Sequence, residues 1–261
     1  SVQFEEHSSG YVEDASGDFE ILLSSSRQVP LELSSNQYEW NLNHTDPGEI
    51  DAIGIVNRAV VWIDDDEDKI GYILRGVDSG FIGHGGIPLE DWNHDLGETQ
   101  EDAWNALETN QDIVFVDSSF ALVDPNTGES ISGMTLPIGK SISLIDISNP
   151  GNSREVVVGG ILSQSSQLFS QGIWMNGEIV EEQFGGVSTR IYVSHTDGET
   201  SVDLEQSLSK DLAKDGVYTS VIEEEILIIL GLIFAILAIF QAYLALGLIV
   251  GIAGIGVVTY R

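Results

Sequence analysis

The sequence predicts an α+β fold of mixed strands and short helices over residues 1–222, followed by one transmembrane helix over residues 223–261. An apolar run from Ile226 to Val258 has 33 consecutive residues without a charge, and about 20 apolar residues are enough to cross a bilayer core. The residues before this run mix β-rich and helical patterns without regular βαβ alternation. They are numerous enough for one large domain or two subdomains.

The first half of the chain contains several predicted strands. One strand begins at Phe19, and the β-rich runs Ile53–Ile63 and Ile70–Val77 form a hairpin around the acidic tip Asp64–Asp68. This tip lacks the spaced glycine and terminal glutamate of a calcium loop. We therefore interpret it as a solvated turn. The glycine-rich residues 78–97 are predicted to be irregular.

A capping box predicts the first helix, because Thr99 is followed three residues later by Asp102. Further strands are predicted at residues 112–117, 141–147, 155–162, 172–175 and 189–194. Thr200 or Ser201 caps a second helix, whose apolar face consists of Leu204, Leu208 and Leu212.

The apolar run itself is predicted to be one continuous helix. Its middle contains no proline, no Asn-Gly pair and no charged turn, so a helical hairpin is not favoured. At a rise of 1.5 Å per residue the helix is roughly 50 Å long, which exceeds the bilayer core.

Acidic residues dominate the composition: 42 Asp and Glu oppose 10 Lys and Arg, giving a net charge of −32. Such a surface repels phosphate backbones, so nucleic-acid binding is not expected. The chain has no cysteine, which excludes disulfides, thiol nucleophiles and thiolate metal sites. The acidity is spread along the chain and suits concentrated salt, where screening weakens self-repulsion. We expect a halophilic source.

The flanks of the apolar run predict its orientation. All 42 carboxylates precede it and Arg261 follows it. The positive-inside rule therefore places the C-terminus in the cytoplasm and the large domain outside the cell membrane. Ser1–Gly10 does not resemble a signal peptide. We expect either that a leader has been removed or that the chain is part of a longer membrane protein.

The apolar run also contains candidate helix-packing residues. Gly247 and Gly251 have the GxxxG spacing, Gly254 continues the same small face, and small residues let membrane helices approach closely. Gln241 has no partner in hydrocarbon, so we expect it to face another helix as well. The alternative is that these glycines are merely tolerated on a face of the helix that contacts lipid.

No catalytic, metal-binding or cofactor-binding constellation is found. His7, His44, His84, His94 and His195 are scattered without metal-ligand spacing, and no nucleophile-elbow sequence is present. We therefore expect neither enzymatic activity nor a cofactor. Asn43 begins the Asn43-His44-Thr45 sequon for N-glycosylation.

Four stretches resemble one family in chain order. Residues 239–257 (IFQAYLALGLIVGIAGIGV) resemble the second transmembrane segment of FtsX-like, MacB-type ABC transporter permeases. Residues 16–21 (SGDFEI) are similar to that family's first strand after its first span. Residues 138–145 and 155–162 resemble paired strands of its periplasmic core domain. Leu204–Ile222 resembles the final helix of that domain and the link into the membrane.

The resemblance implies a permease subunit whose partners are the lipid bilayer, other transmembrane helices and a separate cytoplasmic ABC ATPase. Movements driven by ATP would pass through the long helix to the external domain, for export or mechanotransmission. The alternative is a single-span surface protein, such as an envelope spike of a halophilic virus or archaeon. A third possibility, an anchored exoenzyme, is disfavoured because no catalytic constellation is found.

Overall fold

The computed structural model describes residues 15–25, 50–65, 67–122, 130–166, 170–196, 200–213 and 216–259, with side chains as far as residue 248. Contacts divide the chain into Ser1–Ile222, the N-terminal domain, and Glu223–Arg261, which contains most of the C-terminal helix. Asn43, His7 and His44 lie outside the described residues.

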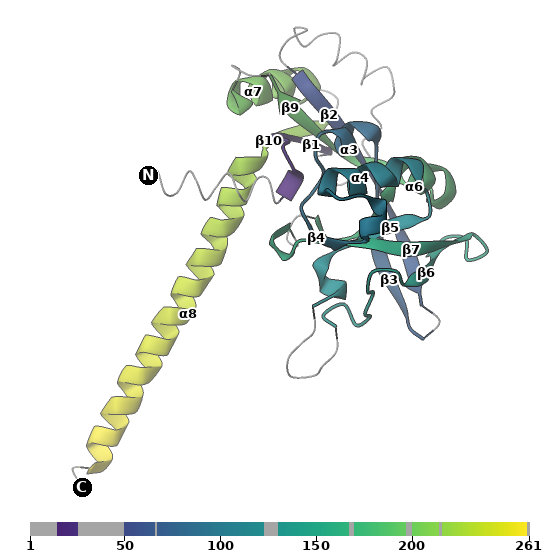
Figure 1. Ribbon diagram of the computed structural model, residues 1–261. Helices are drawn as coiled ribbons and strands as arrows, with labels where there is room; N and C mark the ends of the chain where they lie inside the picture. Colours follow the sequence, from purple (N-terminus) through teal and green to yellow (C-terminus); the bar gives the residue numbers. More distant parts are fainter. Residues whose placement is uncertain are drawn as a thin grey trace. The chain divides into compact units, whose positions relative to one another are not determined.

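Within the described residues, the N-terminal domain consists of strands and short helices (Figure 1). The strands are β1 (Ile21–Ser25), β2 (Ile50–Asp64), β3 (Lys69–Val77), β4 (Leu89–Trp92), β5 (Ile113–Val116), β6 (Ser141–Asp146), β7 (Ser153–Leu162), β8 (Ile173–Asn176), β9 (Val187–His195) and β10 (Val217–Val221). The α-helices are α3 (Ser79–Gly83), α4 (Gln100–Thr109), α6 (Gly177–Phe184) and α7 (Ser201–Leu212), and short 3-10 turns lie at His94–Leu96, Ser118–Phe120 and Gln164–Ser166.

Six strands close into a barrel. From β2 the pairing passes through β3, β8, β5 and β7, and β6 completes the ring by pairing with both β7 and β2. Alternate residues of a strand point to the same side. The side chains on one side of each strand therefore fill the barrel interior. They include Val61, Leu74, Val114, Leu144, Val158 and Met175. Within this ring each strand is paired on both edges, which protects it from edge-to-edge association.

A cluster of aromatic side chains links several elements outside the barrel interior. Phe81 of α3 lies at its centre, with ring centroids 5.5 to 6.1 Å from those of Phe19, Trp104, Trp174 and Tyr192. All five side chains are at most 3% exposed. The cluster joins α3 and α4 to β8, β9 and the segment before β1.

The first half of β2 belongs to an open part of the sheet. There β9, β1 and β10 follow in order, and every pair is antiparallel. Helix α7 covers this region, as Figure 1 shows. Its predicted leucines pack in one core cluster with Ile21, Leu23, Ile191, Val193 and Val217.

Helix α8 (Ile222–Thr259) has 38 residues, so its length is about 57 Å. Its segment Ile222–Leu248 is, among the described residues, the helix that is long and apolar enough to cross a membrane. The predicted continuous helix is therefore confirmed, as is the α+β class.

Two local predictions missed short elements. Residues 78–97 are not irregular, because they contain α3 and β4. Asp78 caps α3 by accepting the Phe81 N–H, and a helix of five residues is too short to show periodicity. Helix α6 was not predicted, although Asn176 caps its start and Gly185, with a φ of 63°, ends it.

The acidic hairpin tip is also more ordered than a solvated turn. Asp65 accepts the backbone N–H groups of Asp68 at 2.8 Å and Glu67 at 3.2 Å, and it forms an ion pair with Lys140. Partial burial opposes ionisation, but these hydrogen bonds prevail and hold the pKa of Asp65 below its usual value. The prediction of a solvated tip was wrong at Asp65.

Candidate functional site

Strands β1 and β10, the first and last strands of the described domain, pair at the edge of the open sheet, and we call this pair the stem. Ile21 lies opposite Val221 and Ser25 opposite Val217. The pairing continues one residue further, because the Ile222 N–H donates to the Glu20 carbonyl oxygen at 2.8 Å. Glu20 and the first residue of α8 therefore lie side by side.

The stem is held by its neighbours. The Glu20 N–H donates to the Val193 carbonyl oxygen of β9 at 3.3 Å, and Thr219 Oγ1 donates to a carboxylate oxygen of α7, Glu205 Oε1, at 2.5 Å. Strand β10 continues into α8 without a loop. The first turn of α8 carries the three carboxylates Glu223–Glu225, which the positive end of a helix dipole favours.

The predicted helix-packing residues lie on two faces of α8. Successive helical residues are about 100° apart, so Gly247, Gly251 and Gly254 share one face while Gln241 lies about 120° away. Gln241 and Gly247 are exposed, and a Cβ added to Gly247 would meet no atom within 4 Å. Among the described residues nothing covers the glycine face at Gly247, and its packing against another helix stays a prediction.

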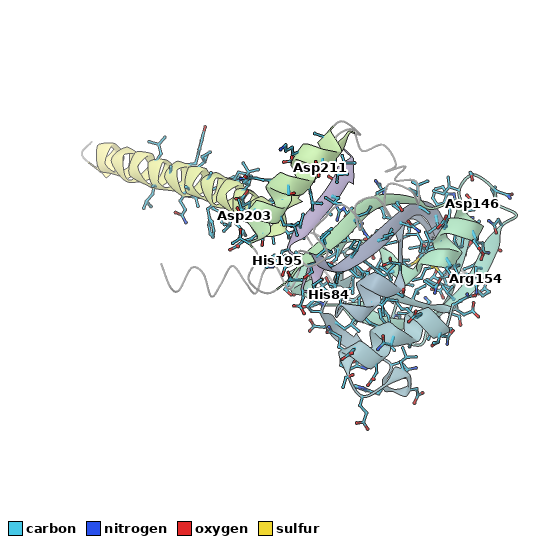
Figure 2. The ribbon with its side chains drawn as sticks, turned by 90° about the horizontal axis from the view of Figure 1, so that it is seen from above. His84, Asp146, Arg154, His195, Asp203 and Asp211 are labelled. Atoms are coloured by element: carbon cyan, nitrogen blue, oxygen red, sulfur yellow. The ribbon has the colours of Figure 1, made fainter. Side chains whose placement is uncertain are left out.

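The histidines of the described segments take part in local contacts. The His84 ring lies 4.5 Å from that of Phe19, and its Nε2 is 3.2 Å from the Asp18 carbonyl oxygen. The His94 ring lies against that of Trp92. Figure 2 labels His84, which follows α3, and His195, which ends β9. Within the described part of the chain, no group of three or more His, Asp or Glu residues could hold a metal ion.

The structure reveals a pair that the sequence pattern did not. His195 Nε2 lies 3.2 Å from Ser201 Oγ, and its Nδ1 lies 3.1 Å from the Thr196 carbonyl oxygen. A hydroxyl beside an imidazole is the geometry of a nucleophile and its base. Here the contact joins the end of β9 to the first residue of α7, and a carbonyl rather than a carboxylate meets Nδ1. It therefore serves to fasten the start of α7.

An open cleft of about 280 Å³ is lined by residues from β2, β3 and α6, with the carboxylates of Asp78, Glu108, Glu178 and Glu181 among them. Asp78 Oδ1 accepts the backbone N–H groups of Ile55 and Phe81, each at 2.9 Å. Burial nevertheless raises the pKa of Asp78. Because its hydrogen bonds tie α3 to β2, we assign Asp78 a structural role.

A buried carboxylate joins the barrel strands. Asp117 is 0% exposed, and its Oδ2 accepts the Tyr72 hydroxyl at 2.8 Å and the Gly172 N–H at 2.7 Å. Its Oδ1 accepts the Ser119 N–H at 3.0 Å and the Ser119 hydroxyl at 2.5 Å. Burial, assisted by the charge of Asp117, raises the pKa of Tyr72 to about 12.

Comparison with known proteins shows similarity in structure only. No family model and no curated protein matches the sequence. The periplasmic region of MacB from Actinobacillus actinomycetemcomitans is similar with a TM-score of 0.53 and 14% identity, over 84% of this chain and 95% of that one. For the extracellular domain of the noncanonic ABC-type transporter YknZ from Gram-positive bacteria, the TM-score is 0.45 and the identity 14%, over 77% and 98% of the two chains.

At 14% identity, the similarity to the MacB region shows the fold of this chain and not its activity. The match covers nearly the whole of the MacB periplasmic region. The N-terminal domain therefore has the fold of the periplasmic region of MacB, and the fold implied by the resemblance in sequence is confirmed.

Proposed function

We propose that this chain is the external domain and the following membrane helix of a MacB-type ABC transporter permease. In this proposal residues 1–222 lie outside the cell membrane, α8 crosses the bilayer, and its C-terminal end reaches the cytoplasm. The ATPase is a separate subunit bound to the permease inside the cell. The chain itself has no enzymatic role and passes movement between the membrane and the external domain.

The pairing of β1 with β10 supports this proposal most directly. A domain inserted between two membrane spans must receive and return the chain at neighbouring points, and Glu20 and Ile222 are hydrogen-bonded neighbours. A protein with a single C-terminal anchor needs no such closeness. Because β10 continues into α8 without a loop, a displacement of the helix pulls on β10 and, through the ladder, on β1.

The length and composition of α8 fit the same role. The hydrocarbon core of a bilayer is about 30 Å thick, whereas 38 helical residues extend about 57 Å. A helix of this length continues beyond the hydrocarbon as a rigid lever. Its glycine face suits close packing against a second membrane helix.

The proposed orientation is tested by cysteine labelling in intact cells. The chain has no cysteine, so a single introduced thiol is the one reactive group. Ser148 lies in the exposed turn between β6 and β7, and Ser148→Cys should react with an impermeant maleimide. Tyr260→Cys should react only after the cells are permeabilised. The reverse labelling pattern contradicts the orientation.

The permease assignment is tested at the glycine face in the native membrane complex. Gly247→Leu overpacks a helix contact at a cost of about 1–3 kcal/mol, and lipid tails are as apolar as leucine, so lipid contact offsets none of it. The Gly247→Leu chain should insert into the membrane normally, but less ABC ATPase should co-purify with it. Gln241→Leu removes an interhelical hydrogen bond worth on the order of 0.6–2 kcal/mol and should have a smaller effect.

Gly231→Leu is the matched control. A Cβ at Gly231 also meets no atom within 4 Å, and 16 residues place it about 160° around the helix from Gly247. Gly231→Leu should leave the complex intact. Normal assembly of Gly247→Leu and Gly251→Leu would count against the permease and for the single-span surface protein.

A further inference from the structure

Three arginines gather on adjacent strands of a domain that has few basic residues. Arg58 of β2 lies directly opposite Arg75 of β3. Arg190 of β9 lies opposite Val56, two residues before Arg58, so all three side chains emerge on the same face of the sheet. The register therefore concentrates positive charge at one place in a chain of net charge −32.

The Arg75 side chain is held in a fixed position. It is 6% exposed, its guanidinium carbon lies 5.4 Å from the centre of the Trp174 ring, and its Nε donates to the Gln171 carbonyl oxygen at 2.8 Å. A Cβ at Gly172 would come within 3.1 Å of Nε, so glycine leaves the space that the side chain fills. In the described part of the chain, its two terminal nitrogens have no hydrogen-bond partner.

This arrangement is unfavourable without a counterion. Like charges directly opposite each other on neighbouring strands destabilise a sheet, and a buried charge is costly unless paired. Burial, and next the charges of Arg190 and Arg58, lower the pKa of Arg75 to about 10.

Three other basic residues of the domain, in contrast to Arg58 and Arg75, form ion pairs. Lys69, Lys140 and Arg154 each form an ion pair with an aspartate. Among the described residues, no carboxylate forms an ion pair with Arg58 or Arg75. The chain has an excess of carboxylates and yet leaves these two arginines without an ion pair within the described residues, although the charge of the buried Asp117 favours the ionised form of Arg75.

We propose that Arg58, Arg75 and Arg190 form a binding site for an oxyanion, a carboxylate or phosphate group carried by a ligand of the domain. Arginine suits this role because its planar fork of N–H donors matches carboxylate and phosphate oxygens. Tyr192, whose hydroxyl accepts a hydrogen bond from Arg190 Nη1 at 3.4 Å, helps to position the site. The proposal does not depend on the orientation of the membrane helix.

The site is tested with the full chain in detergent micelles at low ionic strength. Succinate and inorganic phosphate are titrated by calorimetry, against KCl of equal ionic strength. The expected result is saturable binding of at least one oxyanion that Arg58→Gln weakens by about tenfold or more, the usual loss for a charged hydrogen bond. Arg58 is exposed, so its replacement preserves folding.

Arg154→Gln is the matched control, because Arg154, near the start of β7, forms an ion pair with Asp112. It should bind the oxyanions as the unaltered chain does, and Arg58→Lys should retain part of the affinity. Equal affinities for the unaltered chain and Arg58→Gln would overturn the proposal. Absence of saturable binding of both succinate and phosphate to the unaltered chain would likewise overturn the proposal.

Discussion

The N-terminal domain and α8 use the same apolar residue types in opposite ways. Val61, Ile63 and Leu74 of the barrel are 0% exposed, whereas Ile228 and Leu244 of α8 are 72% and 74% exposed. In a strand, alternation turns one face to the core and the other to solvent. The apolar run of α8 has no charged face that could be turned to water. The hydrophobic content of a segment therefore does not show whether it lies in a core. The spacing of its apolar residues along the chain does.

The two regions also differ in charge. Of the 42 carboxylates, 39 lie before α8 and the other three lie in its first turn, ahead of the apolar run. Ionic conditions therefore act mainly on the domain, whereas α8 depends on lipid or on other helices. The comparison predicts that packing, salt and pH should affect the domain while leaving α8 nearly unchanged.

The largest expected effect comes from an aromatic deletion in the core. Phe81→Ala should lower the free energy of unfolding by about 3–5 kcal/mol, the usual cost of a buried Phe→Ala change, because Phe81 is 0% exposed. Phe240→Ala, at a side chain 63% exposed on α8, should leave it unchanged. Urea unfolding of the full chain in micelles measures both. Equal losses would contradict the distinction between the two regions.

Salt should affect the domain next most strongly. Raising KCl from 0.1 M to 2 M shrinks the Debye length from about 10 Å to a few Å and so screens repulsion among the carboxylates. The melting temperature of the N-terminal domain should rise by several degrees, as followed by near-ultraviolet circular dichroism. The helical signal of α8 should not change. A flat or falling melting temperature would remove the argument for a halophilic source.

Alkaline pH should destabilise the barrel through Tyr72. Its pKa is about 12 in the folded chain against a usual value of 10, so the folded state holds this proton more tightly. The resulting stabilisation is complete below pH 10 and is lost as the pH rises toward 12. Absorbance at 295 nm should show that Tyr72→Phe removes a component titrating near pH 12. Loss of a component near pH 10 instead would refute the assignment.

The smallest expected effect concerns a helix cap. Thr99 and Asp102 form the capping box of α4, and Thr99→Ala should cost about 1 kcal/mol. Thr109→Ala is the control at the other end, where Oγ1 makes only a long 3.4 Å contact with the Ala106 carbonyl oxygen. Urea unfolding distinguishes them. A larger loss for Thr109→Ala would show that the cap does not stabilise α4.

Local patterns predicted the elements whose stabilising contacts lie within a few residues. The Thr99–Asp102 capping box, the leucine face of α7 and the uncharged run of α8 are all present as expected. Helix α3 was missed because a contact with Phe19 and the indole rings, rather than periodicity, holds its five residues. The GxxxG face follows from spacing alone, but its partner helix is not part of this chain's described contacts.

The sequence by itself determined that a charged α+β domain precedes one long apolar helix, because composition and periodicity are properties of short windows. Only the tertiary structure decided that β6 closes the barrel and that Ile21 pairs with Val221, about 200 residues later. It also decided that Arg58 faces Arg75. Strand registers of this kind depend on which surfaces exclude water together, and residues that are distant along the chain set them jointly.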